Sequence, residues 1–386
     1  MTKQTYIFRF PTMVEAGPGL AAKVGEKAKA LGASKVLVVT DPGVARTPHF
    51  KTVTDSLEQA GVAYGVFDQV EPDPSIDVVE KSVGDIARAG YDLFVALGGG
   101  SSIDVTKGLR LLSQFGGVLR DYAPGDKVPG PLKAPFIAIS TTSGTGSQVS
   151  SGAVFSDVAR GTKFTVSSPK LCPTLALNDP LVTMGAPAKV TATAGMDALG
   201  HAIEAYISVN ASPMADIYSL AAIRMVARNL PKVMANGDDL AARDAMLLAS
   251  TVAIVSASNC GLGADHAVAM PLCTLFHLPH GLVIGMMLAP VMEYNLAAAA
   301  SRLAEVAEAL GVDVEGMSEA EAAAQAVAAV RTMARAVGLP QQLREVGVDE
   351  DKLERAANLT MESFQVTNNP RKMAPDSLLA MLKKAF

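Results

Sequence analysis

Three of the five histidines in this sequence, His266, His277 and His280, lie within fifteen residues. A fourth, His201, follows Asp197 by four residues in the segment GMDALGHAIEAY. This spacing places both side chains on one face of a helix, where they can hold a single ion. One carboxylate with neutral imidazoles suits Fe²⁺ or Zn²⁺ better than Ca²⁺ or Mg²⁺. We therefore predict a metal site made of Asp197, His201, His266 and His280, although an isolated helical histidine is more often a core residue.

Two further residues lie close to this set in the sequence. His277 is either a residue that supports the metal site or a surface histidine. Glu204 comes one turn after His201. It could hold a metal-binding histidine in place from behind, or it could be an ordinary solvated helix position.

A glycine-rich segment, LGGGSSID at residues 97–104, directly follows a predicted strand and opens a predicted helix. Glycines let the backbone approach a pyrophosphate, and the free N–H groups of a helix N-terminus face the anion. A tight turn would explain this segment alone. A second loop of small residues, STTSGTGS at 140–147, follows a neighbouring strand, and two such loops favour a dinucleotide site.

Asp41 ends the predicted strand KVLVVT. A carboxylate there can accept hydrogen bonds from the adenosine ribose and would repel a 2′-phosphate, which favours NAD over NADP. The alternative is that Asp41-Pro42-Gly43 is simply a turn.

The elements that must position these residues change in character along the chain. The first half alternates short apolar strands with helices of 10–15 residues, which indicates a parallel sheet with helices on both faces. The predicted strands are 35–40, 64–67, 93–97 and 134–139, and the helices are 50–60, 76–89 and 102–115. Residues 152–168 carry two alternating runs that predict a β-hairpin. The predicted second half is helical, with helices over 186–209, 213–229, 238–258, 315–337 and 374–384.

Length and composition agree with two globular domains. The chain has 386 residues, and 49% of them are hydrophobic, so we predict an α/β dinucleotide domain over 1–182 and a helical metal domain over 183–386. Ligands of such proteins usually bind between the domains. The net charge of −5, without a basic cluster, argues against nucleic-acid binding.

Membrane insertion and secretion are also disfavoured. The most apolar stretches, 245–258 and 282–292, are shorter than the ~20 residues that a spanning helix needs, so we interpret them as core helices. The N-terminus does not resemble a secretory signal. Three separated cysteines favour a reducing cytoplasm.

Taken together, these motifs resemble the iron-containing (group III) alcohol dehydrogenase family along essentially the whole chain. The resemblance is carried by GGGSSIDVTK, Asp179-Pro180, TAGMDALGHAIEAY, HAVAMPLCTLFHLPHG and the closing TNNPR. It implies a Rossmann-like nucleotide domain followed by a helical metal domain, an architecture like that of dehydroquinate synthase. It also implies an NAD-dependent oxidoreductase that uses Fe²⁺, or alternatively Zn²⁺, on a small alcohol or aldehyde. Relatives are commonly dimers or larger homo-oligomers.

The resemblance assigns further residues to the cofactor and to catalysis. The cofactor residues that it implies are Asp41, Gly98, Gly99, Gly100, Ser101, Asp104, Thr141, Thr142, Ser147 and Lys163. Many members carry a second histidine four residues after the third metal ligand, proposed to relay protons, but this chain has Met270 there. A thioether cannot exchange a proton at neutral pH, so water, the cofactor ribose or His277 must replace it. A catalytic role is therefore expected for His277, and we also expect one for Asp104. Gln148 also stands where many members have Glu.

Two alternatives on the same scaffold remain open at this point. One is a zinc polyol dehydrogenase similar to glycerol dehydrogenase, and the other is a hydroxyacid–oxoacid transhydrogenase that keeps its nucleotide bound. A non-catalytic binding protein is a weaker third, because all four predicted metal ligands are present.

Overall fold

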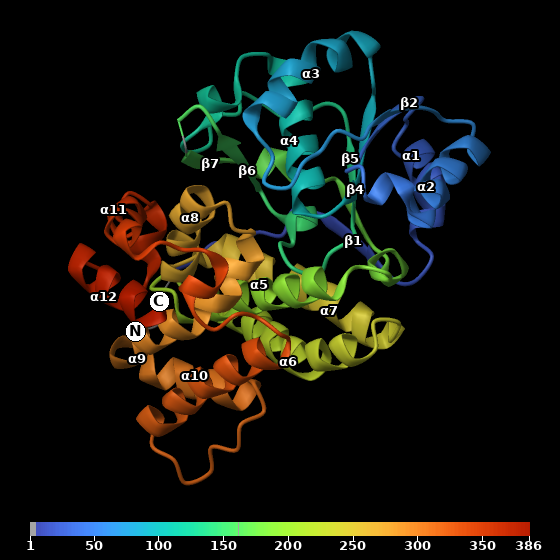
Figure 1. Ribbon diagram of the computed structural model, residues 1–386. Coiled ribbons are helices and arrows are strands. Elements are labelled where there is room, and N and C mark those ends of the chain that lie inside the picture. Colours follow the sequence, from blue (N-terminus) through green and yellow to red (C-terminus); the bar gives the residue numbers. More distant parts are fainter. Residues whose placement is uncertain (1–4, 161) are drawn as a thin grey trace. The chain divides into compact units, whose positions relative to one another are not determined.

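A computed structural model describes residues 5–160 and 162–386 (Figure 1). The chain divides into an α/β unit, Phe10–Ala186, and a helical unit that contains residues 5–9 and Pro187–Phe386. The division therefore falls four residues after the predicted boundary at 182. Residues 5–9 join the helical unit, where Asn259 exchanges two hydrogen bonds with the backbone of Arg9.

The α/β unit is built on a parallel sheet of six strands in the order β1-β8-β5-β4-β2-β3. The strands are β1 Met13–Ala16, β2 Lys35–Val39, β3 Ala63–Phe67, β4 Leu93–Gly98, β5 Phe136–Ser140 and β8 Leu175–Asn178. Its helices are α1 Val24–Ala30, α2 Pro48–Gln59, α3 Ile76–Ala89 and α4 Gly100–Phe115. The predicted Rossmann-like parallel sheet is confirmed, and the sequence analysis missed β1, β8 and α1.

Both faces of the sheet are buried. Alternate residues of β2 divide between two hydrophobic clusters: Leu37 and Val39 enter one, and Val36 and Val38 enter the other. A strand that is buried on both faces needs apolar residues at every position. This requirement explains why the central strands appear in the sequence as continuous Val, Ile, Leu and Ala runs.

The predicted hairpin is present as the antiparallel pair β6 Gly152–Asp157 and β7 Thr162–Ser167. Residue 161, within the predicted hairpin range of 152–168, lies outside the described residues. Short 3₁₀ helices in this unit are 21–23, 44–46, 119–122, 147–149, 169–171 and 180–183.

The helical unit contains α5 Ala188–Ile207, α6 Pro213–Ala235, α7 Leu240–Cys260, α8 Ala264–Phe276, α9 His280–Ala309, α10 Glu319–Ala336, α11 Leu353–Met361 and α12 Pro375–Ala385. Three 3₁₀ helices, 343–346, 350–352 and 364–368, join the last of these. One hydrophobic cluster runs through the whole unit. The helices α8 and α11 were not predicted, and α9 was predicted only in part, through the apolar stretch 282–292 that was interpreted as a core helix.

Two of these helices are longer than the sequence indicated. The apolar stretches 245–258 and 282–292 lie within α7, of 21 residues, and α9, of 30 residues, so their length does not argue against membrane insertion. Both helices are long and apolar enough to cross a membrane. In each, 67% of the most apolar window is buried inside the protein, which is typical of core helices.

Candidate functional site

The helix α5 carries the first two candidate metal ligands. Asp197 and His201 are one turn apart, and both are buried, with 2% and 4% of their surfaces exposed. His201 Nδ1 lies 3.9 Å from Asp197 Oδ2. The i, i+4 spacing therefore brings the carboxylate and the imidazole together, as the sequence predicts.

The other two candidate ligands come from α8 and α9. His266 lies in the first turn of α8, and His280 is the first residue of α9. The Nε2 atom of each points to Asp197 Oδ1, at 3.7 Å from His266 and 3.6 Å from His280. All four predicted ligands thus converge on one point in the helical unit.

The donor atoms of this cluster are suited to an ion. Asp197 Oδ1, His201 Nδ1 and His266 Nε2 are buried and have no hydrogen-bond partner within the described part of the chain. Burying such groups without a partner is costly. The distances from the three imidazoles to the oxygens of Asp197, 3.6–3.9 Å, are close to the ~3.3 Å that separates two ligands of a tetrahedral ion with bonds of ~2.0 Å. Fe²⁺ or Zn²⁺ would satisfy all three atoms at once.

Electrostatics also favour a cation here. Burial opposes the charge of Asp197, but the imidazoles of His201, His266 and His280 outweigh it and hold the pKa of this carboxyl well below its usual range. Burial lowers the pKa of His201 to about 4, against the attraction of Asp197. His201 is therefore neutral at pH 7, which is the form that binds metals.

Glu204 lies behind the cluster and contacts His266. Its Oε2 is 2.6 Å from His266 Nδ1, and its Oε1 accepts the backbone N–H of Asp265 at 2.6 Å. Burial lowers the pKa of His266, but Glu204 and Asp197 together outweigh this effect and raise that pKa to about 10. The contact directs His266 Nε2 toward Asp197. Glu204 is buried, so the solvated alternative is wrong, and its role in supporting a metal ligand stays a prediction.

The closing TNNPR motif holds the segment that precedes His266, a role that the sequence did not reveal. Asn368 Nδ2 donates to the carbonyl of Leu262 at 3.0 Å. Asn369 and Asn295 exchange side-chain hydrogen bonds of 2.8 and 3.0 Å, and both are buried. This amide pair links the end of the chain to α9. Only a contact between distant segments could have identified it.

His277 lies at the turn between α8 and α9. It ends α8 in the left-handed conformation, with φ of 53°, and its side chain is exposed. Met270 occupies the position four residues after His266 and is half-buried. The exposure of His277 leaves its ring open to water, and its role as a proton relay stays a prediction.

In the α/β unit, the two small-residue loops pack against each other. The N–H of Thr141 donates to the carbonyl of Gly98 at 3.0 Å. A Cβ on Gly100 would lie 2.8 Å from Thr145 Cγ2, and one on Gly99 would lie 3.4 Å from Thr142. Ser101 lies in the first turn of α4, beside Gly100. The loops therefore form one surface at the carboxyl ends of β4 and β5, where an anion can meet the helix N-terminus.

The remaining predicted cofactor residues surround these loops with their own contacts. Asp41 Oδ1 accepts the N–H groups of Gly43 and Val44 at 2.9 and 3.0 Å, so this residue does form a turn. A Cβ on Gly98 would lie 3.5 Å from Asp41 Oδ2, so that oxygen lies beside the glycine-rich loop. The turn and the ribose contact are therefore compatible.

Asp104, Ser147 and Lys163 are held by the hairpin and the loops. The N–H of Val154 donates to Asp104 Oδ2 at 2.9 Å, and Lys107 lies 3.6 Å from Asp104 Oδ1. Burial raises the pKa of Asp104 in spite of Lys107. Ser147 is buried in the second loop. Lys163, on β7, forms an ion pair of 2.7 Å with Asp73, so its ammonium group already has one partner.

Comparison with known proteins identifies the family. The N-terminal part, residues 11–180, matches the iron-containing alcohol dehydrogenase family, and residues 191–386 match the C-terminal domain of the Fe-containing alcohol dehydrogenase family. The 1,3-propanediol dehydrogenase of Klebsiella pneumoniae is 36% identical over 394 residues, with 100% of both chains covered.

Two more proteins agree with this result. The NAD-dependent methanol dehydrogenase of Bacillus methanolicus is 36% identical over 379 residues, covering 98% of this chain and 99% of its own. The crystal structure of a 1,3-propanediol oxidoreductase has a TM-score of 0.96 and 36% identity, covering 99% of this chain and 100% of its own. The chain therefore belongs to the iron-containing alcohol dehydrogenase family and is an alcohol dehydrogenase, as the sequence motifs predict.

Proposed function

We propose that this enzyme transfers a hydride between NAD(H) and a small alcohol or aldehyde, and that it holds one divalent ion with Asp197, His201, His266 and His280. The observation that carries the proposal is the set of buried donor atoms around Asp197 that lack a protein partner. Fe²⁺ is proposed first because of the family, with Zn²⁺ as the alternative. When bound, such an ion acts as a Lewis acid toward the substrate oxygen.

The protein contributes position and charge to this chemistry. Asp197 remains an anion because its pKa is held low, and His201 remains neutral. Glu204 fixes the ring of His266. The loops after β4 and β5 offer backbone N–H groups to the cofactor pyrophosphate. We assign Gly98, Gly99, Gly100, Ser101, Thr141, Thr142, Ser147, Asp104 and Lys163 to the cofactor surface, and Asp41 to the choice of NAD over NADP.

The proton that leaves the alcohol needs a carrier other than Met270. We propose water, the cofactor ribose or His277 for this step. The exposed ring of His277 supports exchange with solvent. The names of the relatives suggest substrates: 1,3-propanediol, methanol and, from a lactaldehyde reductase of Escherichia coli, lactaldehyde.

The setting of the enzyme completes the proposal. The three cysteines lie far apart in the sequence and form no CxxC pair, which is consistent with a reducing cytoplasm. A homo-oligomer is proposed from the family, and nucleic acid and membranes are not expected partners. The transhydrogenase and the glycerol-dehydrogenase-like alternatives are not favoured by the comparisons, which name NAD-dependent and diol dehydrogenases.

The test compares two histidines only three residues apart. We expect His280→Ala to lose bound metal and NAD-linked oxidation, while His277→Ala retains the metal. Metal content measured by mass spectrometry and NADH absorbance with a panel of short alcohols would show both effects. Alcohol oxidation by the metal-free His280→Ala variant would refute the proposal. Turnover of a hydroxyacid–oxoacid pair without added NAD would instead indicate the transhydrogenase.

A further inference from the structure

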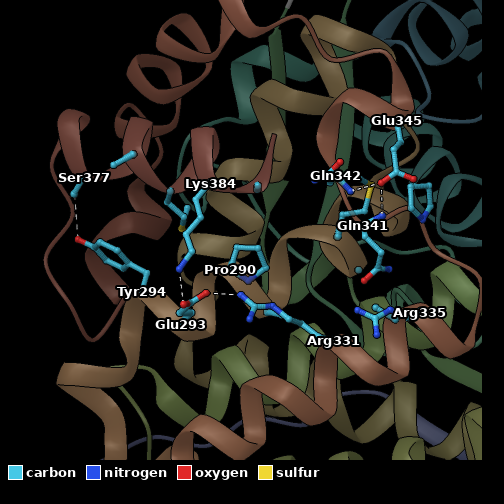
Figure 2. A pocket seen from close by; sticks show the side chains of 18 of the residues that line it. Pro290, Glu293, Tyr294, Arg331, Arg335, Gln341, Gln342, Glu345, Ser377 and Lys384 are labelled. Carbon is cyan, nitrogen blue, oxygen red and sulfur yellow. Dashed lines mark hydrogen bonds and ion pairs between the residues drawn. The ribbon is translucent and has the colours of Figure 1, made fainter.

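The helical unit also contains a cavity that the candidate metal ligands do not line. It has a volume of about 1000 Å³ and lies between α9, α10 and α12. This volume is at the upper end of the range typical of small-molecule sites. Its apolar wall comes from two helices: α9 contributes Gly285, Met286, Ala289 and Pro290, and α12 contributes Ala380, Met381 and Ala385. Figure 2 shows Pro290 among the charged side chains that line the cavity.

The charged side chains of this cavity are mostly basic. They comprise four cations, Arg331, Arg335, Arg371 and Lys384, and two carboxylates, Glu293 and Glu345. The whole chain has a net charge of −5. The cavity is therefore a local positive region on an acidic protein, which attracts anions.

Both carboxylates already have partners. Glu293 Oε1 accepts a hydrogen bond of 2.5 Å from Lys384, and its Oε2 pairs with Arg331 (Figure 2). Glu345 Oε1 accepts the backbone N–H groups of Gln341 and Gln342, at 3.1 and 2.7 Å. Glu293 thus neutralises part of the charge of two cations, and Glu345 caps a local turn.

Two of the arginines have no carboxylate partner among the described residues. Arg371 donates to the carbonyl of Tyr294 at 2.8 Å, and its guanidinium group lies 4.3 Å from the centre of the Tyr294 ring. Arg335 is exposed on α10, and no dashed line reaches it in Figure 2. Guanidinium groups bind phosphate and carboxylate through two parallel hydrogen bonds.

We propose that this cavity binds a small organic anion, either a phosphate monoester or a carboxylate. Its charged group meets Arg335, and its short apolar body lies against Met286, Ala289 and Pro290. The apolar wall distinguishes this ligand from a bare inorganic anion, since it offers contacts that only carbon atoms use. None of the residues that line it is assigned to the metal or to the cofactor, and its existence does not depend on the proposed function.

The test measures binding to the full-length protein by isothermal titration calorimetry. The probes are butyl phosphate, butyrate and inorganic phosphate, at constant ionic strength and with saturating NAD⁺ so that the phosphate loops are occupied. We expect saturable binding of one organic anion per chain, more tightly than inorganic phosphate. The tighter of the two organic probes identifies the class.

Matched variants localise the binding. Arg335→Ala should weaken anion binding at least tenfold, because it removes the guanidinium group that would bind the anion. Alanine has a high helix propensity, so α10 should stay folded. Arg335→Lys should restore part of the affinity. Arg228→Ala, an exposed arginine on α6 outside the cavity, should bind as the unmodified chain does. Absence of saturable binding, equal binding by Arg335→Ala, or equal affinity for inorganic phosphate would overturn the proposal.

Discussion

Replacing Glu204 by Gln tests whether the buried carboxylate behind His266 controls metal binding at the proposed site. Glu204 accepts two hydrogen bonds, one from the N–H of Asp265 and one involving His266 Nδ1, both of 2.6 Å. A glutamine has only one acceptor oxygen. If that oxygen stays on the fixed N–H of Asp265, the amide N–H₂ faces His266 Nδ1. The ring then carries its proton on Nε2, the atom that faces Asp197.

This change should reduce metal affinity by about 10–100-fold, which is about 1.4–2.7 kcal/mol of binding free energy. The carboxylate also favours the proton that competes with the ion for His266, since Glu204 and Asp197 together raise the pKa of this residue to about 10. Removing the carboxylate therefore weakens the competing proton as well as the ion. The loss of ion binding is the larger of the two effects, since a divalent ion interacts with the carboxylate more strongly than a single proton does. The net result is weaker metal binding.

The assay is a chelator competition titration of metal-free protein with Fe²⁺ under anaerobic conditions and with Zn²⁺. Glu308→Gln removes an exposed glutamate from α9 and serves as the control, with unchanged affinity expected. Circular dichroism of the metal-free variants would establish that both are folded. If Glu204→Gln binds either ion as tightly as the unmodified protein, the contact between Glu204 and His266 does not orient a metal ligand.

Three further changes test other parts of the protein. Asp41→Gly should reduce kcat/KM with NAD about tenfold or more, since it removes a charged acceptor, and should raise kcat/KM with NADP. If the ratio of the two kcat/KM values did not change, Asp41 would not select NAD over NADP. Gly100→Val should raise KM for NAD roughly tenfold with unchanged metal content, because its Cβ would lie 2.8 Å from Thr145; an unchanged KM would argue against the loop surface. Removal of the metal by a chelator should lower Tm by roughly 5–10 °C relative to protein with the ion at about 100 times its Kd, and no shift would mean that the ion does not bind the folded state.

The sequence predicts those features that depend on local patterns. The helix α3 begins and ends where the periodicity indicates, at Ile76 and Ala89. Strands buried on both faces appear as continuous apolar runs, so β2 and β4 were found. The spacing of Asp197 and His201 gives their common face directly, because a helix repeats every 3.6 residues.

Other features depend on contacts between distant segments and leave little local signal. The strands β1 and β8 have four residues each and pair with each other across more than 150 positions. The helix α8 contains Pro271, which interrupts the pattern on which a helix prediction relies. The partners of Glu204 are more than 60 positions away, so the sequence alone left its role open.

Glycines explain why His280 can approach the other three proposed metal ligands. A Cβ on Gly281, next to His280, would lie 2.7 Å from the carbonyl oxygen of Thr193 in α5. One on Gly200, next to His201, would lie 2.7 Å from Ile284 Cγ2 in α9. Larger residues at either position would push α9 away from α5, since neither a backbone oxygen nor a packed core side chain can yield. His280 would then move away from Asp197 Oδ1, now 3.6 Å distant. The glycines beside the histidines are therefore part of the proposed metal site, because they allow the two helices to approach closely.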